Sequence, residues 1–271
     1  MYVDSHCHLS FPELHADVAR IRAAMRAARV DRALCICTTL EEFETVHALA
    51  TTYDNFWATV GVHPDNEGVA EPTVDDLVER ASRERVVAVG ETGLDYYRLG
   101  TRSVADMSWQ RERFRVHIRA ALAASKPLVV HTRSAGEDTL AILREEQGGR
   151  VGGVFHCFTE TREVAKAALD LGFYISFSGI LSFRNAEDLR AVARAVPLER
   201  CLIETDSPYL APVPFRGKVN NPSYVPWVAQ ALAQAKGVTP EEVARVTSLN
   251  FERLFALPAW VPTTEEGRNA Q

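Results

Sequence analysis

Short apolar segments alternate with longer stretches of helical periodicity along almost the whole sequence, and this alternation limits the possible folds most. Eight segments have the composition of strands: Tyr2–His6, Ala33–Cys37, Phe56–Val62, Val86–Glu91, Leu128–His131, Gly153–His156, Tyr174–Ser178 and Cys201–Glu204. Most of them are apolar throughout, which is typical of parallel strands that are covered on both faces. The pattern therefore predicts an α/β protein with a parallel sheet.

The segments between these strands carry apolar residues at helical spacing. The predicted helices are Leu14–Arg29, Glu41–Thr52, Thr73–Ser82, Trp109–Ala124, Glu137–Glu145, Thr161–Leu171 and Asn185–Ala195. Two more, Tyr224–Ala235 and Pro240–Phe255, follow the last strand, and Thr239 before Pro240 is a typical N-cap. An open doubly wound sheet shows the same alternation of strands and helices. The Gly-rich loop that such a sheet carries after its first strand is absent from this sequence. We therefore expect a (β/α)8 TIM-type barrel with extra C-terminal helices.

Length and composition limit the class of protein. A chain of 271 residues suits one barrel domain, expected over residues 1–258, with a polar, frayed tail over 259–271. No apolar run approaches the roughly 20 residues of a membrane span, and no leader is visible, so we expect a cytoplasmic protein without membrane contact. The odd number of cysteines, five, argues against a disulfide framework, and nothing implies an obligatory protein partner. The net charge of −6 excludes broad affinity for nucleic acid but not a local basic rim.

Histidines and carboxylates recur at the carboxyl ends of the predicted strands, which meet at one mouth of a barrel. These residues are His6, His8, His63, Glu91, His131, His156, Glu204 and Asp206. The remaining histidines, His15, His47 and His117, lie in predicted helices. Because active sites of this fold are built at that mouth, the distribution predicts the position of a site.

The donor types at this mouth favour metal binding. His6 and His8 share one strand face, so their rings can share an ion, although either alone could be a structural histidine, as could His131 or His156. Four histidines and two or three carboxylates exceed one zinc tetrahedron and suit two divalent ions, Zn, Mg or Mn. We expect Asp206 to be a ligand and general base, or alternatively a turn or cap residue. Glu204 is expected behind the ligands or on an extra ion.

A loop after the last strand carries Arg216, Lys218 and Asn220, in a chain with only four lysines. An arginine and a lysine that flank a glycine can hold a phosphate, although a solvated surface loop explains them as well. Aromatic residues near the expected mouth could stack on bases or simply pack: Tyr96, Tyr97, Phe158, Tyr209 and Phe215.

At these positions the sequence resembles the TatD family of metal-dependent deoxyribonucleases, within the amidohydrolase-like hydrolases. The matching motifs are DSHCHL (4–9), GVHP (61–64), GETGLDYY (90–97), HTR (131–133), FHCFT (155–159), ETDSPYLAP (204–212) and RGKxNxP (216–222). The resemblance implies a two-metal site with the ligands His6, His8, Glu91, His131, His156 and Asp206. It also implies that Glu91 bridges the metals, that Asp206 is the base, that His63 binds substrate or the transition state, and that Arg216 and Lys218 contact phosphate.

Two positions depart from the family pattern. Glu160 stands where glycine is common, and an acid there could alter the mouth or repel phosphate. Asn221 stands where the phosphate loop usually has glutamate, which could change substrate preference.

The leading functional hypothesis is a two-metal phosphodiesterase that degrades DNA, a 3′-to-5′ exonuclease on single-stranded or frayed ends. The first alternative keeps the site but cleaves an ester or amide, such as the acyl bond of a D-aminoacyl-tRNA. The second, of another class, is a non-catalytic scaffold that a metal stabilises.

Overall fold

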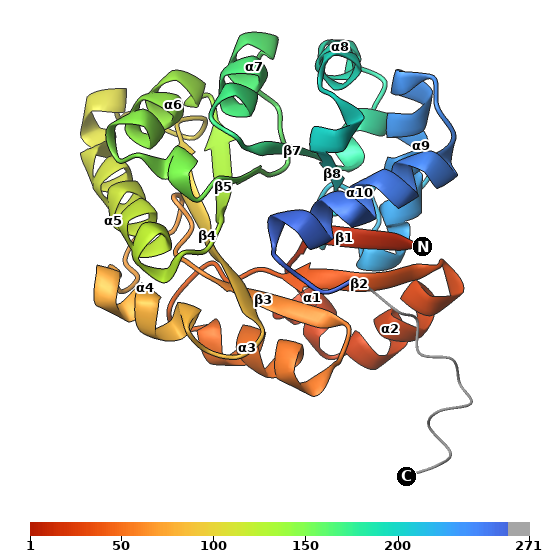
Figure 1. The fold of residues 1–271 in the computed structure, drawn as a ribbon, viewed down its shortest axis with the longest axis horizontal. Coiled ribbons are helices and arrows are strands. Elements are labelled where there is room, and N and C mark those ends of the chain that lie inside the picture. The colour runs from red at the N-terminus through yellow and green to blue at the C-terminus, as the bar shows by residue number, and fades with distance from the viewer. Residues whose placement is uncertain (260–271) are drawn as a thin grey trace.

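The computed structural model describes residues 1–259 as a nearly closed (β/α)8 barrel, which confirms the predicted fold class (Figure 1). Eight parallel strands follow one another in sequence order around the barrel. They are β1 (Tyr2–Cys7), β2 (Val30–Cys35), β3 (Phe56–Val60), β4 (Val86–Asp95), β5 (Leu128–Arg133), β6 (Gly153–Phe155), β7 (Tyr174–Phe177) and β8 (Cys201–Ile203). The tail predicted over 259–271 lies outside the described residues except for residue 259.

Helices surround the strands. They are α1 (Pro12–His15), α2 (Val18–Ala27), α3 (Phe43–Thr52), α4 (Val74–Ala81), α5 (Ser108–Ala124), α6 (Gly136–Glu145), α7 (Arg162–Asp170), α8 (Glu187–Ala195), α9 (Val225–Lys236) and α10 (Pro240–Leu254). The single helix predicted over Leu14–Arg29 is wrong at its start, because the backbone leaves helical geometry at Asp17 (φ −107°, ψ 10°). Thr239 caps α10 as expected, accepting the Glu242 N–H at 3.1 Å. No helix among residues 1–259 is long and apolar enough to cross a membrane.

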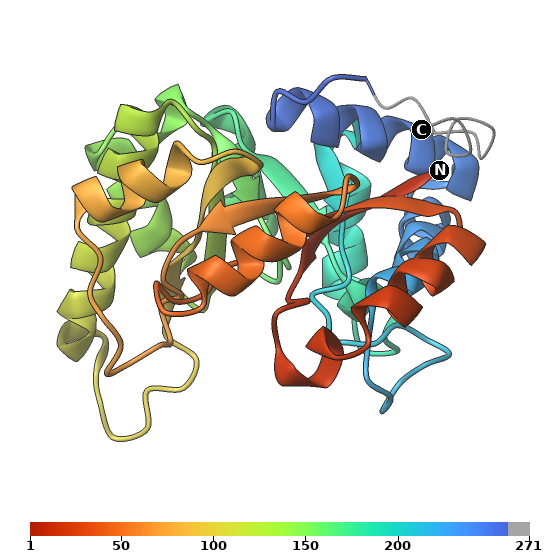
Figure 2. The ribbon, with the colours of Figure 1, turned by 90° about the horizontal axis from the view of Figure 1, so that it is seen from below.

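The apolar residues form two cores, one inside the barrel and one between strands and helices. The inner core is closed at one end by α10, whose Phe251 packs with side chains of the strand interiors such as Trp57 and Leu202. Figure 2 shows α10 across one end of the barrel, with the loops that follow β1, β4 and β8 projecting at the opposite end. Burial of Phe251 therefore leaves only the carboxyl ends of the strands open for a site.

The seam between β8 and β1 is closed by side-chain contacts and a few individual backbone hydrogen bonds rather than by a regular ladder of hydrogen bonds. Asp4 is fully buried and accepts the Thr205 N–H (2.9 Å) and the Thr205 hydroxyl (2.5 Å). The Asp206 N–H donates to His6 O at 3.0 Å, and the His8 N–H donates to Ser207 O at 2.9 Å. These bonds hold against each other the two strand ends that carry four predicted site residues, His6, His8, Glu204 and Asp206.

One buried histidine stabilises the wall of the barrel rather than the site. His117 of α5 is fully buried, accepts the Val62 N–H at 2.9 Å and hydrogen-bonds the Arg113 carbonyl at 2.8 Å. The first of these bonds fixes the backbone directly before His63. Burial lowers the pKa of His117 from 6.5 to about 4.

We predict a pH-dependent contribution of His117 to stability. Because its pKa is lower in the folded chain, the unfolded chain binds more protons between pH 4 and 6.5. Stability is therefore lost as the pH falls through that window, by about 3 kcal/mol at its lower end. Urea unfolding at several pH values should show this extra loss in the wild type but not in His117→Gln. Exposed His15→Gln is the matched control, and parallel profiles for His117→Gln and wild type would contradict the assignment.

Candidate metal centre

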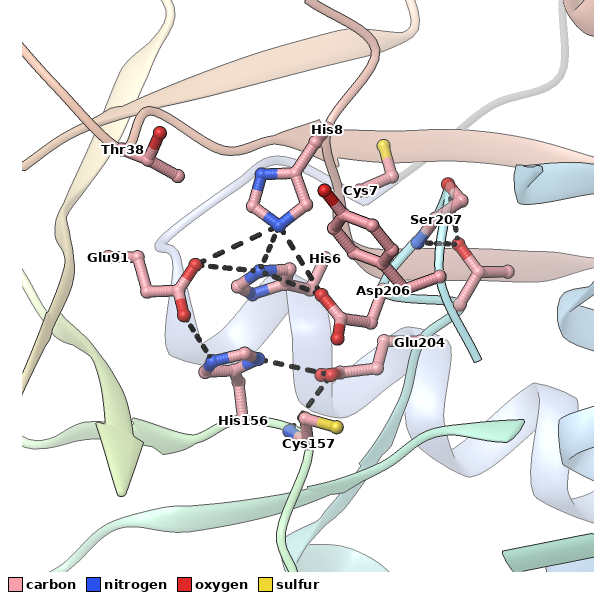
Figure 3. Close-up of polar contacts among 12 residues, drawn as sticks. His6, Cys7, His8, Thr38, Glu91, His156, Cys157, Glu204, Asp206 and Ser207 are labelled. Atoms are coloured by element: carbon pink, nitrogen blue, oxygen red, sulfur yellow. Dashed lines mark hydrogen bonds and ion pairs between the residues drawn. The ribbon is translucent and has the colours of Figure 1, made fainter. Parts of the chain in front are cut away.

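All six predicted metal ligands converge at the open end of the barrel. His6 and His8 lie at the end of β1, Glu91 lies within β4, and His131 lies within β5. His156 and Asp206 follow β6 and β8 directly. Three groups drawn from these residues and His63 have ligand atoms within 4.8 Å of one another: His6–His156–Asp206, His6–His8–Glu91 and His63–Glu91–His131. Figure 3 shows His6, His8, Glu91, His156 and Asp206 turned toward the same space.

Glu91 lies between two sets of histidines and faces each with a different oxygen. Its Oε2 lies 3.2 Å from His6 Nε2 and 3.8 Å from His8 Nε2. Its Oε1 lies 3.2 Å from His63 Nε2, 3.1 Å from His131 Nδ1 and 2.7 Å from His156 Nε2. A carboxylate used from both sides is the arrangement that a bridging ligand requires. The Glu91 side chain is only 3% exposed.

Charge balance around Glu91 fits a cation. Burial raises the pKa of Glu91, but His156, His63 and His6 outweigh burial and hold that pKa well below its usual range. Burial, with His156 beside it, lowers the pKa of His6. Each short contact between a ring nitrogen and a carboxylate oxygen needs either a hydrogen on that nitrogen or a metal ion between the two atoms. A nitrogen and oxygen donor set of this kind suits Zn²⁺ or Mn²⁺.

Two carboxylates behind the ligands set the tautomers of His131 and His156. His131 Nε2 lies 3.0 Å from Asp95 Oδ2, and His156 Nδ1 lies 3.2 Å from Glu204 Oε1. A carboxylate only accepts, so each of these nitrogens carries the hydrogen. In the neutral ring the opposite nitrogen, His131 Nδ1 or His156 Nε2, is then left with its lone pair toward the centre, as a metal ligand must be.

Glu204 is fully buried and orients the ring of His156. Its Oε1 also accepts the Cys157 N–H at 2.8 Å, which fixes the backbone beside His156. Its Oε2 is buried and has no hydrogen-bond partner among residues 1–259. Of the two predicted roles for Glu204, these contacts favour a position behind the ligands.

His63 differs from His131 and His156 in turning a hydrogen rather than a lone pair toward the centre. Its Nδ1 accepts the Asp65 N–H at 3.0 Å, so in the neutral ring the hydrogen lies on Nε2. That N–H faces Glu91 Oε1, and burial lowers the pKa of His63. His63 is thus placed as a hydrogen-bond donor at the edge of the centre, the type of role predicted for it.

Asp206 is the most exposed carboxylate at the centre. Its side chain is 15% exposed, against 3% for Glu91 and 0% for Glu204. Oδ1 lies 3.3 Å from His8 Nε2 and 3.6 Å from His6 Nε2. Burial raises the pKa of Asp206, but the hydrogen bond to His8 and the charge of His6 outweigh burial and lower that pKa. An ionised, accessible carboxylate beside two ligands suits both predicted roles, ligand and base.

The backbone of β4 brings Glu91 close to β5. Gly93 has φ +135°, and a Cβ there would lie 1.9 Å from the carbonyl oxygen of His131. Only glycine permits this approach. The strand prediction that ended at Glu91 was therefore too short, because β4 continues to Asp95 in register with His131 and Arg133.

The predicted phosphate loop has two exposed cations and one buried amide. Arg216 and Lys218 are exposed and form no ion pair within the described chain. Arg216 lies 3.7 Å from the ring centroid of Phe183. Asn220 is fully buried and donates to Thr205 O (2.9 Å) and Tyr209 O (2.6 Å). It ties the loop to the end of β8, and its burial leaves it no exposed atom for a substrate.

Both departures from the family pattern have local structural roles. Glu160 Oε1 accepts the Ala135 N–H at 3.2 Å, directly before α6, and so caps that helix. Asn221 accepts the Ser223 N–H at 3.1 Å and caps the short helix Pro222–Tyr224. The expected effect of Glu160 on phosphate is therefore not needed to explain that residue.

Asp95 is the site residue that sequence reasoning missed. It lies four positions after Glu91, where the predicted strand had already ended, within the quoted GETGLDYY motif. The available signal was its parity, because Glu91, Gly93 and Asp95 alternate along one extended strand. Burial raises the pKa of Asp95, but the hydrogen bond to His131 outweighs it and lowers that pKa.

Fold and site together define a barrel hydrolase with a buried histidine–carboxylate centre for divalent metal. The chain matches the family described as TatD related DNase over residues 3–256. It is 52% identical over 261 residues to the uncharacterized metal-dependent hydrolase YcfH of Escherichia coli, covering 95% of this chain and 96% of that protein. It is 33% identical to the 3′-5′ ssDNA/RNA exonuclease TatD of Citrobacter rodentium, covering 94% and 97%.

A solved structure agrees with these relatives. The crystal structure of YjjV, a TatD homologue from Escherichia coli, superimposes with a TM-score of 0.86 at 27% identity, covering 95% of this chain and 98% of that one. The chain therefore belongs to the TatD family of metal-dependent hydrolases.

We predict that Asp95 supports metal affinity through His131. In Asp95→Asn the side-chain amide can donate to His131 Nε2, and the negative charge is lost. The variant therefore no longer keeps the hydrogen of His131 on Nε2. We expect a 10- to 100-fold loss of Mn²⁺ affinity in competition with a chelator. Asp138→Asn is the matched control, since Asp138 bonds the neighbouring Tyr96 hydroxyl at 2.8 Å but no histidine. Equal affinities of Asp95→Asn and Asp138→Asn would refute the role.

Proposed function

We propose that this protein is a two-metal phosphodiesterase that shortens single-stranded DNA from its 3′ end. The observation that carries the proposal is the two-sided use of Glu91, with histidines on each oxygen and exposed cations on a nearby loop. The exonuclease name of a relative at 33% identity supports the same substrate class.

The residues present would hold two divalent ions, one near His6, His8 and Asp206 and one near His131 and His156, with Glu91 between them. Bound ions of this kind lower the pKa of water and neutralise charge that develops on phosphoryl and leaving oxygens. The partly exposed Asp206 carboxylate is positioned to orient the attacking water and take its proton. His63 donates its Nε2 hydrogen to a phosphate oxygen.

The water oxygen forms a bond to phosphorus, and its proton passes to Asp206. The bond between phosphorus and the 3′ oxygen of the shortened strand breaks, and that oxygen takes up a proton. The products are a 5′-mononucleotide and a strand with a free 3′ hydroxyl. Arg216 and Lys218 hold the incoming phosphates electrostatically.

The proposal predicts a metal-dependent ladder. A 5′-labelled single-stranded oligonucleotide with Mg²⁺ or Mn²⁺ should shorten progressively from its 3′ end. EDTA should abolish the ladder, and Asp206→Asn should lower the rate by at least about 100-fold, since a general base contributes 10²–10⁴-fold. Absence of cleavage by protein that demonstrably binds metal would reject the phosphodiesterase.

A second comparison separates nucleic acid from a small ester or amide substrate. Lys218→Ala should lower kcat/KM on the oligonucleotide several-fold and leave a small activated ester unchanged, because only the polyanion reaches the loop. Lys166→Ala, which removes an exposed lysine paired with Asp170 at 2.8 Å, is the control. Activity on an acyl ester alone, unaffected by Lys218→Ala, would favour the ester or amide alternative.

A further inference from the structure

Three cations at the mouth of the barrel lie over aromatic rings instead of carboxylates. Several arginines elsewhere are paired with acids, as Arg83 is with Glu44. In contrast, Arg133, Arg216 and Lys218 form no ion pair within residues 1–259, and each lies over a ring. In a chain of net charge −6, unpaired cations at one mouth favour an anionic ligand.

Arg133 and Tyr97 form the closest pair of this kind on the side of His131. The Arg133 Cζ atom lies 3.7 Å from the Tyr97 ring centroid. Tyr97 is 59% exposed, which is unusual for so large a ring. By comparison, Tyr96 (8% exposed) and Phe158 (1%) are buried in the core, so their predicted role in stacking is replaced by packing.

The stacked arrangement leaves the donors of Arg133 free. A guanidinium that stacks uses its face, whereas its five N–H groups point outward in the plane. The Arg133 side chain makes no hydrogen bond to any described residue, although its charge lowers the pKa of nearby Asp95. An arginine over an aromatic ring with unused N–H donors is able to hold a phosphate.

The pair is fixed relative to the metal centre. Asp95 Oδ1 accepts the Tyr97 N–H at 2.8 Å, and Asp95 Oδ2 holds His131 at 3.0 Å. The Tyr96 N–H donates to Arg133 O at 2.9 Å, which joins the ends of β4 and β5. One carboxylate therefore anchors both a metal ligand and the aromatic residue beside it.

We propose that Tyr97 and Arg133 form a subsite for one nucleotide of a single strand, with the base stacked on the pair and its phosphate bound by the Arg133 N–H groups. Stacking on aromatic or arginine planes is the sequence-tolerant way in which proteins hold unpaired bases. The subsite deepens the proposed phosphodiesterase, on which its role in catalysis rests. Arg216 and Lys218, on the loop after β8, would hold other phosphates of the same strand.

Binding rather than cleavage tests the subsite. Fluorescence anisotropy of labelled dA8 is compared with an abasic octamer of the same phosphate number, using the Mn²⁺-loaded Asp206→Asn protein to slow cleavage. The parent should bind dA8 more tightly than the abasic octamer. Adding Tyr97→Leu should weaken dA8 binding about tenfold and leave abasic binding unchanged, whereas Tyr97→Phe, which keeps the ring, should stay within about twofold.

Arg133→Gln should weaken both octamers and reduce the slope of log affinity against log salt by about 0.7, the value for one phosphate contact on a single strand. Arg98→Gln is its control, since Arg98 is an exposed arginine one residue after Tyr97 and stacks on no ring among the described residues. A smaller change for Arg98→Gln supports the assignment, and an equal change overturns it.

The remaining outcomes are also decisive. Equal binding of dA8 and the abasic octamer by the parent, or equal loss of both in Tyr97→Leu, would overturn the subsite. Cleavage by the wild type without dependence of binding on Tyr97 would reject the subsite and keep the phosphodiesterase. Base-dependent binding through Tyr97 without any cleavage would keep the subsite and reject the phosphodiesterase.

Discussion

The site depends on one buried carboxylate that faces histidines from both sides. Glu91 Oε2 meets the β1 histidines, and Glu91 Oε1 meets His131 and His156 from the neighbouring strands. A charge this deeply buried costs several kcal/mol unless cations compensate it. The other features of the centre can be understood as ways to hold those compensating groups in place.

Three structural features hold the groups that compensate the charge of Glu91 in place. The glycine at position 93 lets β4 press against β5, which brings Glu91 within reach of His131. Asp95 and Glu204 hold the outer ring nitrogens of His131 and His156, so that the inner ones face Glu91. Asp4 and Thr205 close the seam where β8 meets β1, so that His6, His8 and Asp206 remain adjacent. Rigid support of this kind is what precise ligand geometry requires.

The barrel could be predicted from the sequence, and so could the convergence of histidines and carboxylates at its mouth, because both follow from strand periodicity and parallel topology. His6, Glu91 and His156 are far apart in sequence, yet each ends a predicted strand. Their meeting then follows from the fold alone. The predicted roles of the individual ligands in metal binding and catalysis await the experiments above.

Contacts between loops could not be predicted in the same way. Asn220 was expected at the substrate, but its amide is consumed by two backbone carbonyls that a linear sequence does not bring together. Glu160 caps a helix that begins more than twenty residues earlier, which depends on how two mouth loops pack. Asp95 was missed because a charged residue was taken to end its strand, whereas the close approach at Gly93 extends it.

The central claim is that Glu91 bridges two ions. Anomalous diffraction from crystals grown with Mn²⁺ tests it most directly. The account predicts two peaks, one between Glu91 Oε2 and the His6–His8 pair and one between Glu91 Oε1 and the His131–His156 pair. A single fully occupied peak, or two peaks that do not share Glu91, would contradict it.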